Sequence, residues 1–422
     1  MARRYFGTDG VRGVVGESLT PELVKRLGRA AALWSPGGRV FIGRDTRGSG
    51  PELEAAFADG VASAGGNAVL GGVLPSPAVA LLALDLGAVI SASHNPPEYN
   101  GVKFFDAAGQ KLTDASEEEI EALLDEPPSA ARGTIDHVEI SADSYLEHVL
   151  ERFGSDLSGL RVAVDCANGA YSEIAPTAFE RLGADVVPLA TEPDGTNINV
   201  GCGATDLSLL ARTVPEQRAD LGVAFDGDGD RMLAVDAEGN PVDGDQILAI
   251  LALDLAVDFV VVTVMTNLGF HQLMEEHGIR VLTTDVGDRY VLEALRREGG
   301  VLGGEQSGHI ICLDGHVTGD GLAAALLLCR ALQGRPLAEA AARMPRFAQV
   351  QENVRLAGDR KVPPAVLQEV KRLNIELDGR ARILVRPSGT EPVLRILAEA
   401  SDPDEAAEYC GTISALVRRE LG

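Results

Sequence analysis

The sequence has few aromatic residues, few cysteines and no long unbroken apolar run. Aromatics make up 4% of its 422 residues, so its cores must be built mainly from alanine, valine, leucine and isoleucine. Five scattered cysteines without a Cys-x-x-Cys pair argue against a disulfide framework and fit a reducing compartment. The longest apolar stretch, about 247–265, is broken by Asp254 and Asp258, which predicts a buried helix and strand instead of a membrane span. The start, MARRYFGTDG, lacks the apolar segment of a secretory signal.

Basic residues are also few. The sequence has 37 lysines and arginines and 63 aspartates and glutamates, which gives a net charge of −26. A protein that binds a nucleic-acid duplex normally carries a basic surface, so this balance argues against such a partner. The acidity favours solubility and still allows an anionic substrate, provided that arginine and lysine gather locally. Glycine is abundant at 48 residues, which indicates tight turns and backbone that closely approaches ligands.

One pattern of an apolar strand, a loop with glycine or asparagine, a helix, a glycine and a second strand occurs three times. Such units predict α/β domains with largely parallel sheets. Their helices are expected at about 51–65, 172–182 and 268–277. After residue 348 the pattern changes and predicts a smaller α+β domain. Its strands are expected at 349–356, 381–386 and 393–399, and its helices at 363–374 and 403–420. Breaks in composition place the domains at 1–150, 151–247, 248–347 and 348–422.

The segment DGDGDR at 226–231 follows the apolar run LGVAF and has three aspartates at alternate positions. Asp226, Asp228 and Asp230 can converge on one hard cation because the glycines between them let the backbone fold tightly. An EF-hand is excluded, since its sixth and twelfth positions would be Arg231 and Ala237. The alternative is an acidic surface turn, but three aspartates this close would repel one another without a cation. We therefore predict a Mg²⁺ site with an open position for a phosphate oxygen.

A second polar loop lies in ISASHNPPEYNGVKFF at 90–105, with Ser91, Ser93, His94 and Lys103. A serine beside a histidine can be an activated nucleophile, but no Gly-x-Ser-x-Gly elbow is present, so a hydrolase triad is not supported. Taken alone, the loop is better explained as an ordinary turn with a solvated histidine. If this loop lay close in space to the aspartates at 226–230, a catalytic role for Ser93 would be favoured.

The segment RPSGTEPVLR at 386–395 is a candidate phosphate site. Arg386, Ser388, Thr390 and the N–H groups around Gly389 could cradle a phosphate dianion. A Pro-Gly turn between two strands explains the segment equally well.

The segment GGEQSGHI at 303–310 alternates Glu305, Ser307 and His309, which an extended backbone would place on one face to bind a polyol. Without context, a polar edge segment is the better explanation. GTDGVRG and GRDTRG place arginines among glycines, either as phosphate contacts or in structural Arg–Asp turns. These arginines are Arg12, Arg44 and Arg47.

Taken in order, these segments resemble the α-D-phosphohexomutase superfamily. The points of likeness, which run from residue 7 to 395, are FGTDGVRG, ISASHNP, TNINVGCGATD, AFDGDGDR, VGDRYV, GGEQSGHI and RPSGTEP. GGEQSGH, with Gln306, and CGATD are more similar to the bacterial branch that acts on glucosamine phosphates than to the phosphomannomutase/phosphoglucomutase branch. Asp285 departs from the family pattern, where we expect a neutral or basic residue.

The resemblance implies three related mixed α/β domains around a central cleft and a smaller α+β C-terminal domain. It implies that Ser93 is a phosphoserine and that Asp226, Asp228 and Asp230 hold one Mg²⁺ with an oxygen of that phosphoserine. The residues that match other reaction-centre positions are Arg12, His94, Lys103 and His309, and Lys103, His309 and Arg12 are candidate general bases. The residues that match substrate-binding positions are Arg231, Glu305, Ser307, Arg386, Ser388, Gly389 and Thr390.

The implied activity is that of a cytoplasmic intramolecular phosphotransferase. It would interconvert glucosamine 6-phosphate and glucosamine 1-phosphate through a 1,6-bisphosphate and so supply UDP-N-acetylglucosamine and cell-wall precursors. The partner is a small phosphosugar, with no nucleic acid or membrane, and a homodimer is a possible assembly. The alternatives are a mutase for glucose or mannose phosphates, a phosphosugar phosphatase and a non-catalytic sugar-phosphate sensor.

Overall fold

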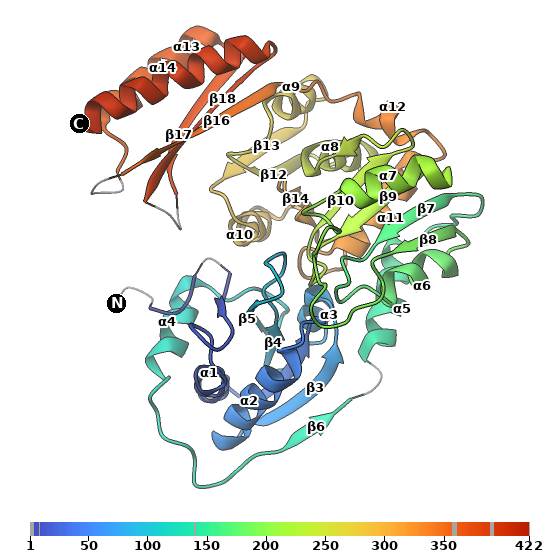
Figure 1. The fold of residues 1–422 in the computed structure, drawn as a ribbon, viewed down its shortest axis with the longest axis vertical. Helices are drawn as coiled ribbons and strands as arrows, with labels where there is room; N and C mark the ends of the chain where they lie inside the picture. The colour runs from blue at the N-terminus through green and yellow to red at the C-terminus, as the bar shows by residue number, and fades with distance from the viewer. Residues whose placement is uncertain (1–3, 8, 139–140, 357–360, 389–391, 422) are drawn as a thin grey trace. The chain divides into compact units, whose positions relative to one another are not determined.

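The computed structural model describes residues 4–421 except 8, 139–140, 357–360 and 389–391 (Figure 1). The chain divides into two compact units. The first contains Met1–Val264 and Leu282–Ala341, and the second contains Met265–Val281 and Ala342–Gly422. Among the described residues, no helix has the length and apolar character needed to span a membrane. All five cysteines are buried free thiols, as the sequence predicts.

The first unit begins with a six-stranded mixed sheet in the order β1-β5-β4-β2-β3-β6. Strands β2, β3, β4 and β6 are parallel, whereas β5 is antiparallel to β4 and β1. The strands are β1 (Val11–Val14), β2 (Arg39–Arg44), β3 (Asn67–Val73), β4 (Leu86–Ile90), β5 (Tyr99–Asp106) and β6 (Ile135–His137). The helices are α1 (Pro21–Trp34), α2 (Gly50–Ser63), α3 (Ser76–Leu81) and α4 (Asp114–Ala122). Helices α1 and α2 lie side by side (Figure 1), and their apolar faces join the core of this sheet.

The second sheet has the order β11-β10-β9-β7-β8, with β8, β7 and β9 parallel and β10 and β11 added antiparallel. Its strands are β7 (Arg161–Asp165), β8 (Asp185–Leu189), β9 (Leu221–Phe225), β10 (Met232–Asp236) and β11 (Pro241–Val242). The helices of this part are α5 (Ser141–Phe153), α6 (Ile174–Arg181) and α7 (Ser208–Gln217). The segment DGDGDR at 226–231, here called the aspartate loop, joins β9 to β10. It therefore lies at the carboxyl end of a buried parallel strand.

The third sheet has the order β13-β12-β14-β15 and combines a parallel β12–β14 pair with an antiparallel β14–β15 pair. Its strands are β12 (Phe259–Thr263), β13 (Arg280–Thr284), β14 (Leu302–Gly304) and β15 (Ile310–Cys312). The helices are α8 (Gly244–Asp254), α10 (Asp288–Glu298), α11 (Gly321–Leu332) and α12 (Leu337–Ala341). The apolar stretch at 247–265 is therefore a helix followed by a strand, as predicted.

The second unit contains an antiparallel sheet in the order β16-β18-β17. Its elements are α9 (Leu268–Glu276), β16 (Ala348–Arg355), α13 (Pro364–Leu377), β17 (Ala381–Pro387), β18 (Val393–Ala400) and α14 (Pro403–Leu421). Helices α13 and α14 cover one face of the sheet (Figure 1). The predicted fold class of three mixed α/β sheets and a smaller α+β part is confirmed.

Candidate active site

Ser93 lies in the loop after strand β4, and its side chain is buried. Its backbone φ is 53°, a left-handed conformation that a serine adopts only when its surroundings hold it. The hydroxyl Oγ donates to Asp226 Oδ2 at 2.6 Å and lies 3.2 Å from His94 Nδ1. Burial, Arg231 and Arg12 lower the pKa of His94 to about 4, so its ring is neutral at physiological pH. The loop between β4 and β5 that holds Ser93, here called the serine loop, thus meets the aspartate loop in space.

Arg47 holds the backbone of this serine loop. Its side chain is fully buried, and Nη2 donates to the carbonyl oxygens of Ser93 and Asn95, both at 2.8 Å. Nη1 donates to the carbonyl of Tyr99 at 3.0 Å, and Nε donates to Asp45 Oδ2 at 2.9 Å. Of the two explanations for GRDTRG, the structural Arg–Asp turn is therefore correct for Arg47.

Asp226, Asp228 and Asp230 are all buried, and one oxygen of each lies within 4.8 Å of the others. Burial, together with the charges of Asp230 and Asp228, raises the pKa of Asp226 to about 7. Oδ1 of Asp228 is a buried oxygen without a hydrogen-bond partner. This free oxygen and a donor set made only of carboxylates fit a hard divalent cation.

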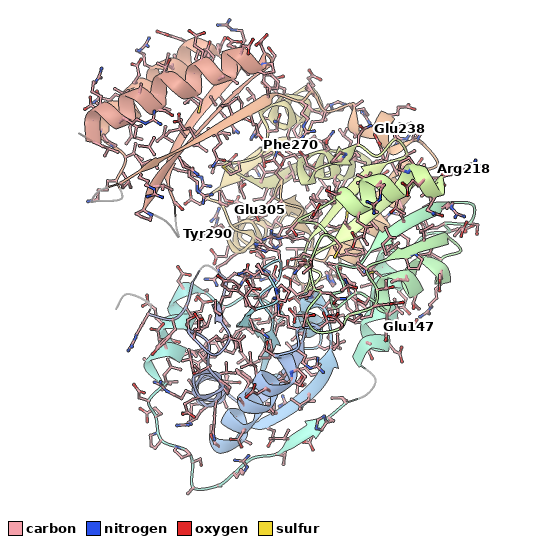
Figure 2. All side chains as sticks on the ribbon, in the orientation of Figure 1. Glu147, Arg218, Glu238, Phe270, Tyr290 and Glu305 are labelled. Atoms are coloured by element: carbon pink, nitrogen blue, oxygen red, sulfur yellow. The ribbon has the colours of Figure 1, made fainter. Side chains whose placement is uncertain are left out.

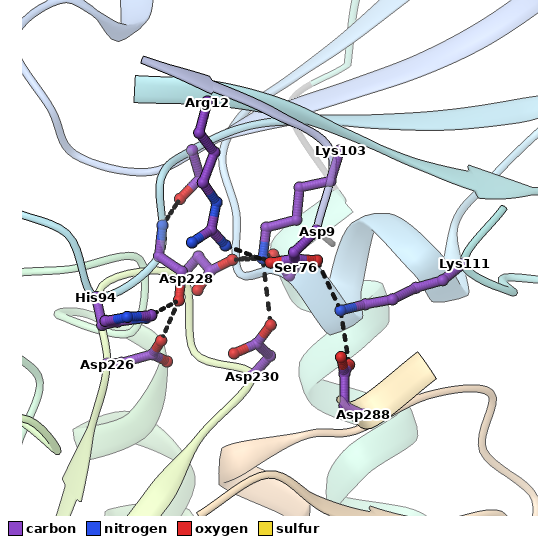
Figure 3. A network of polar contacts seen from close by, with 12 residues as sticks. Asp9, Arg12, Ser76, His94, Lys103, Lys111, Asp226, Asp228, Asp230 and Asp288 are labelled. Atoms are coloured by element: carbon purple, nitrogen blue, oxygen red, sulfur yellow. Dashed lines mark hydrogen bonds and ion pairs between the residues drawn. The ribbon is translucent and has the colours of Figure 1, made fainter. Parts of the chain in front are cut away.

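Lys103, on strand β5, brings positive charge to the aspartates (Figure 3). Its Nζ forms an ion pair with Asp228 and lies 3.2 Å from Asp230 Oδ2 and 3.5 Å from Asp9 Oδ2. Burial alone would lower the pKa of Lys103, but these carboxylates outweigh burial and hold it well above its ordinary value. The ammonium group therefore keeps its proton beside the aspartate loop.

A second lysine, Lys111, extends this network toward helix α10 (Figure 3). Its Nζ lies 2.9 Å from Asp9 Oδ1 and 2.6 Å from Asp288 Oδ2, in the first turn of α10. Arg12 also forms an ion pair with Asp9. The polar network thus joins residues on and beside the first sheet, and the first turn of helix α10, to the aspartate loop.

Glu305, labelled in Figure 2, directly follows β14, and His309 directly precedes β15, so the two residues flank the turn between these strands. The prediction that an extended backbone places Glu305, Ser307 and His309 on one face is wrong. Gly308 has a φ of 93°, and its N–H donates to the Glu305 carbonyl at 3.0 Å, so the segment is a tight turn. The turn brings His309 Nδ1 to 3.2 Å from Glu305 Oε2 and leaves Ser307 exposed at its tip.

His309 and Arg231 add two more positive groups. His309 Nε2 lies 3.0 Å from Asp230 Oδ1. Burial alone would lower the pKa of His309, but Asp230 outweighs burial and raises it to about 10. Burial likewise opposes the charge of Arg231, yet Asp226 and Asp230 raise the pKa of its guanidinium. Lys103, His309 and Arg231 are therefore charged at neutral pH, whereas His94 is neutral.

The candidate phosphate loop belongs to the second unit. Arg386 is directly opposite Arg395 in the β17–β18 register, and two like charges across a sheet would repel without an anion or other compensation. Ser388 is buried, and its N–H donates to the carbonyl of Val393 at 2.9 Å. Gly389 and Thr390 lie outside the described residues.

Four domain families match the chain in order. They are the phosphoglucomutase/phosphomannomutase α/β/α domains I at residues 3–130, II at 143–239 and III at 243–347, and the C-terminal domain at 339–416. The phosphoglucosamine mutase of Pelotomaculum thermopropionicum is 49% identical over 98% of both chains. The chain belongs to the phosphohexomutase family. The phosphoglucosamine mutase of Moorella thermoacetica is 50% identical over 95% of this phosphohexomutase and 96% of that protein.

A solved structure is similar along the whole phosphohexomutase chain. It is a phosphoglucomutase/phosphomannomutase family protein from Burkholderia thailandensis, with 25% identity and a TM-score of 0.84. The match covers 99% of this chain and 96% of that one. The family predicted from the seven sequence segments is therefore confirmed, together with its fold.

The sequence does not identify Asp9, Lys111 and Asp288 as members of this phosphohexomutase site. Asp9 and Asp288 lie inside the family-like segments GTDGVRG and VGDRYV, but no local pattern distinguishes them from surface aspartates. Lys111 belongs to no motif. Only the long-range pairing of Lys111 with both aspartates reveals them.

Proposed function

We propose that this phosphohexomutase interconverts glucosamine 6-phosphate and glucosamine 1-phosphate through a 1,6-bisphosphate, with Ser93 as the phosphoryl carrier. The observation that supports it is Ser93 Oγ, held 2.6 Å from Asp226 in a buried group of three carboxylates. In the first step the Oγ–phosphorus bond breaks and a bond from phosphorus to a sugar hydroxyl oxygen forms. The hydroxyl proton passes to a general base, and Ser93 later accepts the other phosphoryl group.

Asp226, Asp228, Asp230 and an oxygen of phospho-Ser93 would hold one Mg²⁺. Such a cation offsets negative charge on a phosphoryl group during transfer. The charged groups of the chain support the same task, because Lys103, Arg231 and His309 all carry positive charge beside the carboxylates. Lys103, His309 and Arg12 are the general bases that the sequence offers, but Lys103 and His309 hold a proton here and would have to lose it before they could accept the hydroxyl proton.

We assign the sugar to Glu305 and Ser307 and the distal phosphate to Arg386, Ser388, Gly389 and Thr390. Glucosamine phosphate is the proposed sugar because GGEQSGH, with Gln306, and CGATD match the glucosamine-phosphate branch. Relatives that are 49% and 50% identical are named phosphoglucosamine mutase. We propose a cytoplasmic enzyme whose partner is a small phosphosugar, with no nucleic acid or membrane, and that forms a homodimer.

The test is intact mass and mutase activity of the wild type and of Ser93→Ala. The wild type should carry one phosphoryl group that Ser93→Ala lacks, and the variant should lose at least about 10⁴-fold in activity because the carrier is gone. Ser116→Ala, on the surface of α4, is the matched control and should retain both. Full activity of Ser93→Ala would overturn the mechanism.

The substrate is tested by assaying glucosamine, glucose and mannose 6-phosphates side by side. A preference for glucose or mannose phosphate would contradict the proposed sugar. Release of inorganic phosphate at the rate of isomerisation would instead identify a phosphatase. Absence of all turnover, with phosphosugar binding retained, would identify a sensor.

A further inference from the structure

A buried polar cluster lies behind the aspartate loop in the first unit. It joins Tyr145 of α5, Tyr171 before α6 and Asp320 at the start of α11. Tyr145 Oη donates to Asp320 Oδ2 and Tyr171 Oη donates to Asp320 Oδ1, both at 2.8 Å, and the two hydroxyl oxygens are 2.6 Å apart. All three side chains are buried, and the proposed mechanism uses none of them.

Asp320 is the ionised centre of this cluster. Burial would raise its pKa, but His316, 3.1 Å away through Nε2, and the N–H of Ala323 outweigh burial and lower it. Burial and the charge of Asp320 hold the pKa of each tyrosine well above its ordinary value, so both hydroxyls keep their protons. Two neutral hydroxyls therefore bind one carboxylate through charge-assisted hydrogen bonds, which are stronger than bonds between neutral groups.

The cluster reaches the aspartate loop by two routes that meet at Gly229. Asp320 is the N-cap of α11, and the N–H of Gly321, the first residue of that helix, donates to the Gly229 carbonyl at 3.0 Å. The ring of Tyr171 lies directly against Gly229, where a Cβ atom would be 2.4 Å from Cε2. Gly229 separates Asp228 from Asp230, so α11 and the Tyr171 ring both constrain the backbone between two of the three carboxylates.

We propose that Asp320 is a positioning residue, which acts through Tyr171 and the N-terminus of α11 to set the spacing of Asp228 and Asp230 for a divalent cation. This inference rests on the metal site of the proposed function. It extends that site to residues that touch neither the cation nor the sugar. Groups hydrogen-bonded directly to metal ligands typically change metal affinity by 10- to 100-fold when they are removed, and we expect the lower end here because Asp320 acts through the backbone of Gly229.

The chain offers a matched pair of variants for the test. Tyr171→Phe and Tyr145→Phe each remove one hydroxyl from Asp320, but only the Tyr171 ring contacts Gly229. Binding of Mn²⁺ to the unphosphorylated full-length protein is measured by electron paramagnetic resonance, and thermal unfolding is followed in parallel. Tyr171→Phe should bind Mn²⁺ about tenfold more weakly, whereas Tyr145→Phe should change the affinity by less than about twofold. Both variants should unfold at similarly lowered temperatures.

Two results would separate failure of this inference from failure of the metal site. If Tyr171→Phe unfolds earlier but binds Mn²⁺ as the wild type does, the cluster is only structural and the positioning role is wrong. If the wild type itself binds no Mn²⁺, the proposed metal site fails and the inference fails with it. Asp320→Asn, which keeps an N-cap oxygen, should weaken Mn²⁺ binding at least as much as Tyr171→Phe.

Discussion

The backbone conformation of Ser93, the proposed phosphoryl carrier, depends on an arginine that takes no part in the proposed chemistry. Ser93 has a left-handed backbone, and its carbonyl accepts hydrogen bonds from Arg47 Nη2 at 2.8 Å and from Asn199 Nδ2 at 2.9 Å. Arg47 contacts several carbonyls of this loop at once because its planar guanidinium carries five N–H donors in a fixed fork. A lysine has one compact ammonium group and cannot span the same carbonyls. The conformation of the serine loop is thus set by residues outside it.

We predict that Arg47→Lys destabilises the first unit by about 3 kcal/mol, because buried carbonyls lose their donors and Asp45 loses its fork-shaped partner. The serine loop should relax, so kcat should fall by at least about tenfold while the fraction of folded protein at low temperature stays high. Chemical denaturation and the mutase assay measure the two effects.

Arg44→Lys is the control, because Arg44 is partly exposed and pairs with Glu54 at 3.3 Å. Its effect on stability should stay below about 1 kcal/mol. Equal losses for the two substitutions would show that Arg47 has no special part in holding the serine loop.

Some single residues were predictable from the sequence and others were not, for a physical reason. Asp226, Asp228 and Asp230 are close in the chain, so their spacing alone indicates convergence. Lys111 and Asp288 are separated by 177 positions and meet only when the third sheet is in place. Alternate polar residues at 305–309 resemble a strand and predict an extended segment, whereas the positive φ of Gly308 makes it a turn.

Whole elements were easier to predict than contacts. The helices expected at 51–65, 172–182 and 268–277 are α2, α6 and α9, each with its ends within about three residues of the prediction. The positions of these helices can be predicted because apolar runs bounded by glycine are a local feature of the sequence. The antiparallel strands β5 and β10 escaped the repeat pattern, because strand order depends on pairing between distant segments.

Helices α1 and α2 make their closest approach at glycines. A Cβ atom on Gly28 of α1 would lie 2.2 Å from the carbonyl oxygen of Phe57, and one on Gly60 of α2 would lie 2.0 Å from that of Lys25. Both obstacles are backbone atoms of the other helix, which cannot turn away as a flexible side chain can. The two helices can therefore pack this closely only without a side chain at either position.

We predict that Gly28→Ala lowers the free energy of unfolding by about 2 kcal/mol, since the overlap with Phe57 forces the helices apart and outweighs alanine's better helix propensity. Gly411→Ala in α14 is the matched control, because nothing lies within 4 Å of the added Cβ. In Gly411→Ala the higher helix propensity of alanine is not opposed by a steric overlap, so this substitution should stabilise the second unit by about 1 kcal/mol. Urea denaturation measures both changes, and two changes of the same sign would contradict the packing argument.

Over the whole molecule, charge is distributed unevenly. Acidic residues exceed basic ones by 26, yet Arg12, Lys103, Lys111 and Arg231 gather around the aspartate loop. The local bases compensate the buried carboxylates, although the chain as a whole is acidic. An anionic substrate is thus compatible with an acidic protein, as the sequence analysis requires.

The second unit is assembled from two separate parts of the chain, and a buried carboxylate joins them. Glu399 of β18 is fully buried, and its Oε1 accepts hydrogen bonds from the N–H of Leu268 at 3.2 Å and from Gln349 Nε2 at 2.8 Å. Arg382 of β17 pairs with Oε2 and donates to the carbonyl of Thr266 at 2.7 Å. The N-terminus of α9 is therefore bound to the C-terminal sheet, although the sequence repeat groups this helix with β12.

We predict that Glu399→Gln destabilises the second unit by about 3 kcal/mol, because Arg382 loses its anionic partner in a buried setting. If α9 unfolds together with this sheet, hydrogen exchange of α9, β17 and β18 should become about 100-fold faster, whereas α8 and α11 keep their protection. Glu352→Gln on β16 removes the charge that pairs with Arg418 at the surface but keeps an oxygen that can accept from Ser414, so it should change exchange little. Unchanged protection of α9 alongside faster exchange in β17 and β18 would show that the helix is not part of this cooperative unit.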